Sequence, residues 1–237
     1  MQISPLAFDG AYIIRPRIST DERGAFLELF SQPAFQQAVG HQLSVAQVNC
    51  VLLRQGTIRG IHTTAPPPGQ SKYIACASGA MIDILVDIRI GSPTFGQNIS
   101  VRLDAEKWHV LYLAEGLAHG VASLTEEATI VYLCSSTYSP DQQIVINPLD
   151  PELALPWPAT EKFRLSERDR NAPTLSEARE LGILPTYSDC VELYNGFCAA
   201  ERNDPANGHR SDAGLRRLGT SRGTAATLRR DPRDPAR

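Results

Sequence analysis

The chain has 237 residues, of which 42% are hydrophobic and 21% are charged, with a formal net charge of −3, so we expect a soluble, globular domain with appended segments. No run reaches the roughly 18 apolar residues that a membrane-spanning helix needs, so no membrane partner is expected. The N-terminus has neither a basic start nor a continuous apolar stretch, so we expect no export signal and a cytoplasmic protein.

The chain between Tyr12 and about Pro158 has the pattern of an all-β domain. A short helix is predicted at 32–39. Runs rich in Val, Ile, Leu and Tyr are separated by Gly, Pro and Asp clusters at intervals of roughly 8 to 12 residues, as in an antiparallel sandwich or barrel. The predicted strands cover 44–53, 71–77, 80–89, 98–103, 109–113, 120–124 and 129–136.

The clearest alternation lies in the segment MIDILVDIR, at residues 81–89. Successive side chains of a strand point to opposite faces, so Asp83, Asp87 and Arg89 are expected to share one face. The aliphatic residues between them would share the other. One side of this strand is therefore predicted to carry acidic groups.

The C-terminal part of the chain has a different composition. A second short helix is predicted at 174–181, where Thr174 and Glu177 fit a capping box. We expect a domain over 1–187 and an extension over 188–237. Residues 201–237 hold nine arginines against five acidic residues and few large apolar side chains, so we expect disorder from about residue 200. The tail lacks aromatic residues and a binding motif, so no nucleic-acid partner is expected.

Two of the five histidines lie in glycine-flanked, turn-like contexts: His62 in RGIHTT and His119 in GLAHGV. A histidine that faces a barrel interior can accept a proton near neutral pH. On context alone, a hydrogen-bonded structural histidine is the simpler interpretation. A metal site is not expected, because β-barrels that bind iron or manganese usually offer an HxH pair, whereas Thr63 and Thr64 follow His62.

Motifs for other chemistries are absent from the sequence. We find no GxSxG, no GxGxxG and no GxxxxGK[ST], so hydrolase, dinucleotide and phosphate-loop functions lack support, and no cofactor is expected. Five widely separated cysteines without CxxC spacing argue against a disulfide framework or a zinc knuckle. Arginines and amides gather near the first histidine in the sequence: Arg23, Gln47, Asn49, Arg54 and Arg59. Arginine forks suit phosphate oxygens, so a ligand with a diphosphate is an open alternative to simple surface charge.

Nine blocks of the sequence together resemble one known family. They are DERGAFLELF, AQVN, TIRGIH, PPPGQSKYI, GAMIDILVDIRIGSPTFG, LAEGLAHGV, VYLCSSTY, LDPELALPWP and LSERDRNAP. In this order and spacing they resemble the dTDP-4-dehydrorhamnose 3,5-epimerase family of deoxysugar biosynthesis, over residues 1 to about 187. The resemblance implies an all-β, cupin-type jelly-roll sandwich or barrel with short peripheral helices, a homodimer, no metal, and a dTDP-4-keto-6-deoxyhexose as substrate.

The resemblance also implies roles for individual residues. His62 matches the family's base, and Asp169 matches the carboxylate that orients it. Lys72 matches a cation near the carbonyl oxygen, and Tyr132 matches the acid that returns a proton from the opposite face. The remaining matches are positions that contact sugar, diphosphate or thymidine: Arg23, Phe26, Glu28, Gln47, Asn49, Arg59, His119, Tyr138, Gln143 and Arg170.

The sequence departs from the family pattern at two places. Thr63 and Thr64 stand where the family often has Tyr-Gln, and Gln143 stands where many members carry Glu. Antibiotic-sugar relatives that invert only C3 or only C5 share this style of sequence, so a single-site epimerase is an alternative to the favoured 3,5-epimerase. A non-catalytic or metal-dependent sugar-binding cupin is a further alternative, against which the four intact catalytic matches argue.

Overall fold

The structure is a computed structural model, and it describes residues 1–160 and 162–202. The expected disorder from about residue 200 therefore lies almost entirely outside the described residues. The elements are β1 (Gln2–Pro5), β2 (Ala11–Arg15), β3 (Ile18–Asp21), β4 (Gly24–Leu27), α1 (Gln32–Val39), β5 (Gln47–Arg54), β6 (Ile58–Thr64), β7 (Lys72–Ser78), β8 (Ala80–Val86), β9 (Asn98–Asp104), β10 (Val110–Leu113), β11 (Ala118–Ser123), β12 (Glu127–Cys134), a 3-10 turn (Pro140–Gln142), β13 (Gln143–Val145), α2 (Glu167–Arg170), α3 (Leu175–Glu180) and α4 (Tyr187–Arg202). Among the described residues, no helix is long and apolar enough to cross a membrane.

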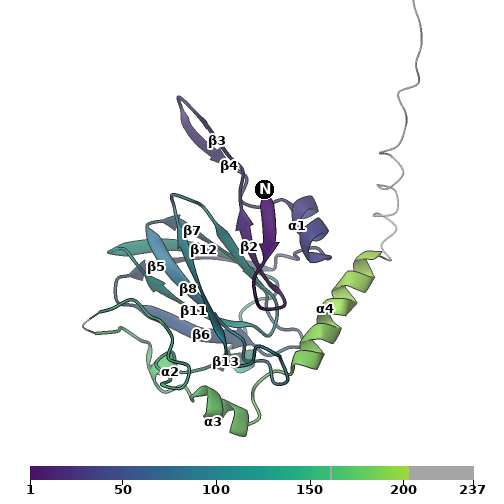
Figure 1. The fold of residues 1–237 in the computed structure, drawn as a ribbon, viewed down its shortest axis with the longest axis vertical. Helices are drawn as coiled ribbons and strands as arrows, with labels where there is room; N and C mark the ends of the chain where they lie inside the picture. The colour runs from purple at the N-terminus through teal and green to yellow at the C-terminus, as the bar shows by residue number, and fades with distance from the viewer. Residues whose placement is uncertain (161, 203–237) are drawn as a thin grey trace, which may run out of the picture. The chain divides into compact units, whose positions relative to one another are not determined.

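Two antiparallel sheets form the body of the structure (Figure 1). One sheet has the strand order β1-β2-β10-β7-β12-β5, and the other has the order β13-β6-β11-β8-β9. Neighbours within both sheets are mostly distant in sequence, as in β7, which pairs with both β10 and β12. This arrangement confirms the predicted all-β, cupin-type jelly roll with short peripheral helices.

The main core lies between the two sheets. Because side chains alternate along each strand, one face of each sheet turns inward, and buried residues such as Leu53 and Ile130 from one sheet pack with Met81 and Leu85 from the other. Burying each such side chain contributes about 1.5–3 kcal/mol. The interior is therefore mostly apolar, and the few polar residues that face it are candidates for a functional role.

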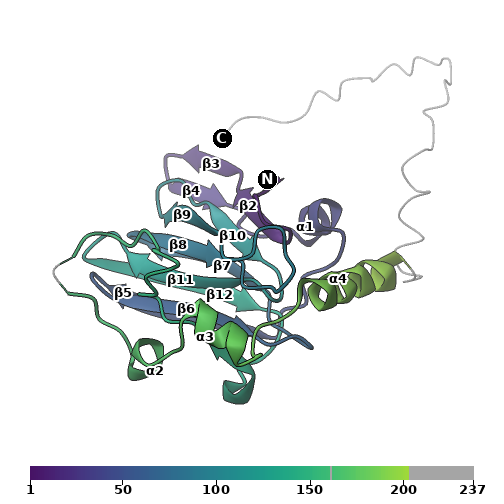
Figure 2. The same cartoon turned by 60° about the horizontal axis from the view of Figure 1, so that its bottom comes forward.

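The helices cover the outer faces of the sheets. Phe35 and Val39 of α1, together with Tyr194 of α4, pack on outward-facing residues of the six-stranded sheet. Leu175 and Ala178 of α3 pack on the outer face of the five-stranded sheet. Figure 2 shows α1 near α4 and α2 near α3. Each sheet thus has a second apolar layer over part of its outer face, while Val48 and Leu52 of β5 remain exposed.

All predicted strands and helices occur in the structure, but the strands β1, β2, β3, β4, β6 and β13 were not predicted. Each of the seven predicted strands overlaps an observed strand, and α1 has the predicted bounds Gln32–Val39. Thr174 caps α3, and its capping box with Glu177 is present. Helix α4, which extends past residue 187, was not predicted from the sequence. It carries Gly196 within its length and is anchored through tertiary contacts, such as the hydrogen bond of 3.4 Å from Tyr194 Oη to Tyr112 Oη.

The segment MIDILVDIR departs from its predicted alternation. Strand β8 ends at Val86, so Asp87 and Arg89 lie in the following loop, where they form a buried ion pair with an Nη2–Oδ2 distance of 2.8 Å. Burial raises the pKa of Asp87, but hydrogen bonds from Arg89, Ser92 and Thr94 outweigh it and hold this pKa below its usual value. Only Asp83 of the predicted acidic face therefore lies on the strand and faces the sandwich interior with Leu85.

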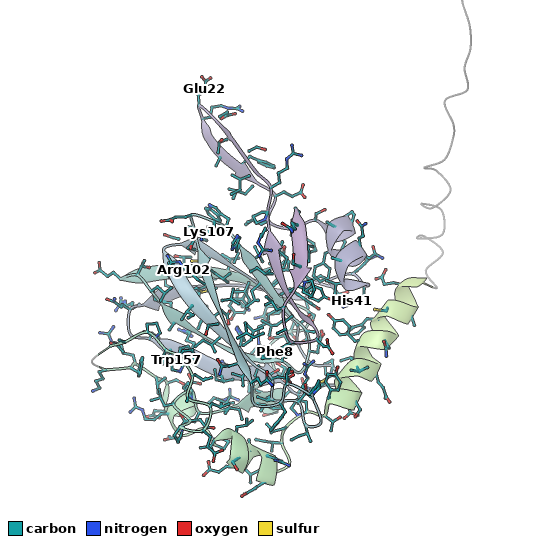
Figure 3. The ribbon with its side chains drawn as sticks, viewed as in Figure 1. Phe8, Glu22, His41, Arg102, Lys107 and Trp157 are labelled. Carbon is teal, nitrogen blue, oxygen red and sulfur yellow. The ribbon has the colours of Figure 1, made fainter. Side chains whose placement is uncertain are left out.

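The β3–β4 hairpin stands away from both sheets. Its residues pair only with each other, with Ile18 opposite Leu27 and Asp21 opposite Gly24. Glu22 lies at its tip, far from the body of the sandwich (Figure 3). Phe26 is 71% exposed, which is unusual for a phenylalanine in a folded chain.

Candidate active site

A cavity of about 320 Å³ opens between the two sheets. Nine of the fourteen site residues predicted from the sequence line it. They come from both sheets and from the loop after β12: Gln47, Asn49, Arg59, His62, Lys72, His119, Tyr132, Tyr138 and Gln143. Asp169 lines an adjoining cavity that shares Arg59, His62, Tyr138 and Gln143 with the first. The structure thus brings together ten of the fourteen residues.

Strand alternation explains how the six-stranded sheet supplies its part of the lining. On β12, Ile130 and Tyr132 both face inward, and on the neighbouring β7 the same holds for Lys72 and Ile74. Tyr132 lies opposite Asn49 of β5 in the ladder. Polar groups from three adjacent strands of this sheet therefore face the cavity.

His62 and His119 are paired on the opposite sheet. They are direct partners in the β6–β11 ladder, and the register then shifts so that Arg59 pairs with Val121. Two glycines allow the close approach at this bulge, because a Cβ on Gly60 would lie 2.4 Å from the Cα of Gly120. The glycine-flanked contexts of both histidines thus have a structural cause.

His62 forms a short hydrogen bond with Asp169. The Nε2 atom of His62 lies 2.6 Å from Oδ1 of Asp169, which comes from helix α2, 107 positions away in sequence. Ser166 caps this helix by accepting a hydrogen bond of 3.0 Å from the backbone N–H of Asp169. The carboxyl group of Asp169 is thereby fixed beside the imidazole.

The ionisation of Asp169 determines the tautomer of His62. Burial of the carboxyl group raises its pKa, but hydrogen bonds from His62, Ser166 and the backbone of Gly60 outweigh this and hold the pKa of Asp169 below its usual value. A carboxylate can only accept, so Nε2 of His62 carries the hydrogen and Nδ1 keeps the lone pair. The side chain of His62 is 33% exposed and lines the cavity, so this lone pair is available for a proton.

His119 has a carboxylate partner as well. Its Nδ1 donates to Asp83, with a distance of 3.0 Å to Oδ1. Burial lowers the pKa of His119, and Lys72 lowers it further, while Asp83 opposes both effects. The net lowering keeps the ring neutral near pH 7, which leaves its Nε2 as a hydrogen-bond acceptor. Asp83 was not predicted as a site residue. The alternating pattern of residues 81–89, which placed its carboxylate on one face of the strand, could have indicated it.

Lys72 and Tyr132 occupy the opposite wall of the cavity. Lys72 is 6% exposed, and burial lowers its pKa, although Cys134 and Asp83 oppose this. Burial also raises the pKa of Tyr132, which keeps its phenol protonated at neutral pH. The site therefore offers a potential proton donor and a cation across from the imidazole of His62.

A chain of hydrogen bonds lines the mouth of the cavity. Gln47 donates to Oδ1 of Asn49 at 2.8 Å and accepts from the backbone N–H of Tyr138 at 2.9 Å. The phenol of Tyr138 accepts from Arg168 at 3.2 Å. Arg168 was not predicted from the sequence, whereas Arg170, which was, lines neither cavity. The two arginines flank Asp169 in the same short helix, so the sequence offered little basis for choosing between them.

The two departures from the family pattern contact each other. Gln143 of β13 pairs with Thr64 of β6 in the ladder, and its Nε2 donates to Oγ1 of Thr64 at 2.6 Å. Thr63 and Thr64 are both buried, and Gln143 lines the cavity beside His62. A neutral amide that is hydrogen-bonded to a hydroxyl thus stands at this point of the wall, where the resemblance led us to expect a carboxylate in many relatives.

Three predicted contact residues lie away from the cavity. Arg23, Phe26 and Glu28 belong to the β3–β4 hairpin or follow it, are exposed, and line neither cavity of their own chain. The guanidinium of Arg23 instead pairs with Asp21 in the hairpin. Within one chain, the structure does not bring these three residues to the site.

Comparisons with known proteins identify relatives of this chain in sequence and in structure. The family model described as dTDP-4-dehydrorhamnose 3,5-epimerase matches residues 5–177. A dTDP-4-dehydro-6-deoxyglucose 3-epimerase from Streptomyces sp is 51% identical over 183 residues, which cover 77% of this chain and 93% of the relative. A dTDP-4-dehydrorhamnose 3,5-epimerase from Mycolicibacterium smegmatis is 42% identical over 190 residues, which cover 80% of this chain and 94% of that protein. The crystal structure of the 3'-monoepimerase ChmJ from Streptomyces bikiniensis with dTDP-quinovose has a TM-score of 0.80 and 48% identity, covering 82% of this chain and 98% of ChmJ.

Proposed function

This chain belongs to the dTDP-4-dehydrorhamnose 3,5-epimerase family, and we propose that it inverts C3, C5 or both in a dTDP-4-keto-6-deoxyhexose. The observation that carries this proposal is the arrangement of one cavity: His62, with Asp169 of α2 beside it, lies on the five-stranded sheet, while Tyr132 and Lys72 lie on the six-stranded sheet. Inversion of a carbon needs a base on one face and an acid on the opposite face. Two facing sheets supply that geometry.

The proposed reaction begins with loss of a proton next to the C4 ketone. The lone pair on Nδ1 of His62 takes this proton, and the Asp169 carboxylate stabilises the imidazolium that forms. The electron pair of the broken C–H bond moves into the enolate, whose oxygen is stabilised by the ammonium of Lys72. The phenol of Tyr132 then protonates the carbon from the other face. Every role in this scheme is filled by a side chain of the protein.

The polar mouth of the cavity is suited to the nucleotide part of the substrate. Arg59 and Arg168 line the adjoining cavities, and guanidinium groups bind diphosphate oxygens in a bidentate fashion. We assign sugar or nucleotide contacts to Gln47, Asn49 and Tyr138 as well. Neutral His119 would accept a hydrogen bond from a sugar hydroxyl through Nε2.

We further propose that a second copy of the chain completes the site. Arg23, Phe26 and Glu28 match substrate-contact positions, yet none of them lines the cavity of its own chain, and the β3–β4 hairpin stands away from the sandwich. An exposed phenylalanine on a projecting hairpin is suited to contact another molecule. In this arrangement each hairpin reaches the cavity of its partner in a homodimer. Light scattering tests the assembly, and a purely monomeric active enzyme would contradict it.

A specific observation favours C3-only inversion as a second candidate. The relatives named as 3-epimerases are 51%, 50% and 44% identical to this chain, whereas those named as 3,5-epimerases are 41–45% identical. Regiochemistry depends on small displacements of acid and base around the sugar ring, so identity alone does not decide it.

One experiment tests both candidates. The protein is incubated with dTDP-4-keto-6-deoxyglucose in D₂O, and NMR follows deuterium at C3 and C5 together with the configuration of the product. Exchange with inversion at both carbons supports the 3,5-epimerase, and exchange at C3 alone supports the second candidate. Binding of the nucleotide sugar without exchange at either carbon would refute the epimerase proposal and favour a sugar-binding protein.

A further inference from the structure

Asp83 is buried behind the wall of the cavity between the sheets. The residue is 0% exposed and lines neither that cavity nor the adjoining one. In the β8–β11 ladder it lies opposite Val121, which does line the cavity. A buried carboxylate is costly unless other groups compensate its charge, so the groups around Asp83 indicate what it does.

The carboxylate of Asp83 holds the ring of His119. Both of its oxygens accept from Nδ1 of His119, at 3.0 Å and 3.2 Å. Because Nδ1 carries the hydrogen, Nε2 keeps its lone pair, and the side chain of His119 is 14% exposed where it lines the cavity. Asp83 therefore fixes both the orientation and the tautomer of a ring that reaches the cavity.

Lys72 carries its ammonium into the same cavity from the other sheet. The residue is 6% exposed, and no hydrogen bond or ion pair to another residue among 1–160 and 162–202 holds this ammonium. Burial favours the neutral amine over the ammonium. In the proposed reaction the proton must stay, because only the ammonium offers a positive charge to the enolate oxygen.

The charged and titratable groups around Lys72 come from both sheets. They are Tyr132 and Cys134 of β12, Asp83 of β8, His119 of β11, and Arg59 and His62 of β6. Burial lowers the pKa of Lys72, whereas Cys134 and Asp83 raise it. Burial also raises the pKa of the Cys134 thiol, which is therefore uncharged near neutral pH. Of these groups, Asp83 is thus the one that supplies a negative charge.

We propose that Asp83 is a positioning residue of the epimerase, which orients His119 and supplies the negative charge that keeps the side chain of Lys72 an ammonium. One carboxylate behind the wall then serves two groups on opposite sheets. Because Asp83 does not line the cavity, it acts through these two groups and not on the substrate. The inference rests on the proposed function, since Lys72 needs its charge only if an enolate forms.

The substitution Asp83→Asn separates the charge from the hydrogen bond. An asparagine can still accept from Nδ1 of His119 through its Oδ1, but it carries no charge. The pKa of Lys72 should then fall, because less negative charge opposes the effect of burial. In the full-length protein, kcat for deuterium exchange from D₂O into the dTDP-4-keto sugar should decline at high pH as Lys72 loses its proton. We expect this decline at a pH about one unit or more lower in Asp83→Asn than in the wild type.

A matched control removes a different buried charge. Asp104→Asn makes the same change on the adjacent strand β9, at a residue that is 3% exposed and lines neither cavity, so it should keep the wild-type pH profile. An unchanged decline at high pH in Asp83→Asn, or an equal shift in the control, would overturn the proposal. Absence of exchange in the wild type would instead refute the epimerase function itself.

NMR of lysine-labelled protein follows Lys72 directly and does not depend on turnover. The chain has only three lysines, Lys72, Lys107 and Lys162, and Lys72→Arg assigns the signal of interest. We expect an ammonium at Lys72 throughout the pH range in which the wild type catalyses exchange, and loss of this proton at lower pH in Asp83→Asn. If that variant fails to fold, the wild type still decides, because a neutral amine at Lys72 at the pH of maximal exchange would overturn the proposal.

Discussion

The substitution Asp169→Asn isolates the contribution of the carboxylate behind His62. In the wild type, Nε2 of His62 lies 2.6 Å from a carboxylate whose side chain is only 4% exposed. An asparagine of the same shape can present an N–H to this nitrogen, which moves the ring hydrogen to Nδ1 and removes the lone pair from the cavity. The protonated imidazole also loses its counter-ion.

The size of the effect follows from burial. Breaking a buried ion pair costs about 3–5 kcal/mol, and the 33% exposure of the His62 side chain reduces this to about 2–4 kcal/mol. That range corresponds to a loss of about 30- to 1,000-fold in turnover. We expect kcat to carry most of the loss, because Asp169 acts through His62 rather than by binding substrate.

The assay is deuterium exchange from D₂O into the dTDP-4-keto sugar, followed by NMR, alongside steady-state kinetics. The exposed residue Asp141, changed to asparagine, provides a matched control that should keep wild-type rates. A loss below about tenfold, or a loss confined to KM, would refute the assigned role of Asp169.

Three other predictions follow from the same geometry. His62→Ala should slow both deuterium exchange and epimerisation by about 100-fold or more, while dTDP binding, measured by calorimetry, stays nearly unchanged. Near-normal turnover would exclude His62 as the base. Tyr132→Phe should retain exchange but lose inversion, because the enolate still forms and is reprotonated by the imidazolium, so NMR should find deuterium in unepimerised substrate; a parallel loss of both would assign Tyr132 to enolisation instead. The pKa of Asp87 is lower in the folded than in the unfolded chain, so its contribution to stability is present above an unfolded value of about 3.9 and is lost as the pH falls through the folded value. Urea unfolding at a series of pH values should therefore show that the free energy of unfolding falls less at acid pH in Asp87→Asn than in the wild type. An equal fall in both proteins would show that Asp87 is not responsible.

Local patterns were sufficient to predict much of the fold. Runs of Val, Ile, Leu and Tyr between Gly, Pro and Asp clusters identified seven strands, and a helical pattern at 32–39 and the capping box at Thr174 identified two helices. Among the described strands, β1, β2, β3, β4, β6 and β13 were not predicted. All of these except β6 have five residues or fewer, too few for a clear periodicity, and Gly60 interrupts β6. Helix α4 was missed because its stability depends on contacts such as that between Tyr194 and Tyr112, which sequence pattern does not reveal.

The site was predicted less completely by residue patterns alone. Glycine contexts selected His62 and His119, but Asp169 is far away in sequence, and only family resemblance connected it to His62. Asp83 and Arg168 were missed because their roles arise from partners that the fold brings together. Arg23 and Phe26 were predicted to contact the substrate, but no sequence pattern indicated that their hairpin stands away from the cavity of its own chain.

The position of the β3–β4 hairpin has a genetic consequence. If each cavity borrows the hairpin of its neighbour, a chain that lacks His62 and a chain that lacks Arg23 and Phe26 are each inactive alone, yet they repair one another when mixed. In a mixed pair, the intact hairpin of the first chain serves the intact base of the second, while the other cavity has neither. Random pairing of equal amounts would then restore about a quarter of the full activity. Loss-of-function alleles of this gene would accordingly fall into two complementing groups, one in the sandwich and one in the hairpin.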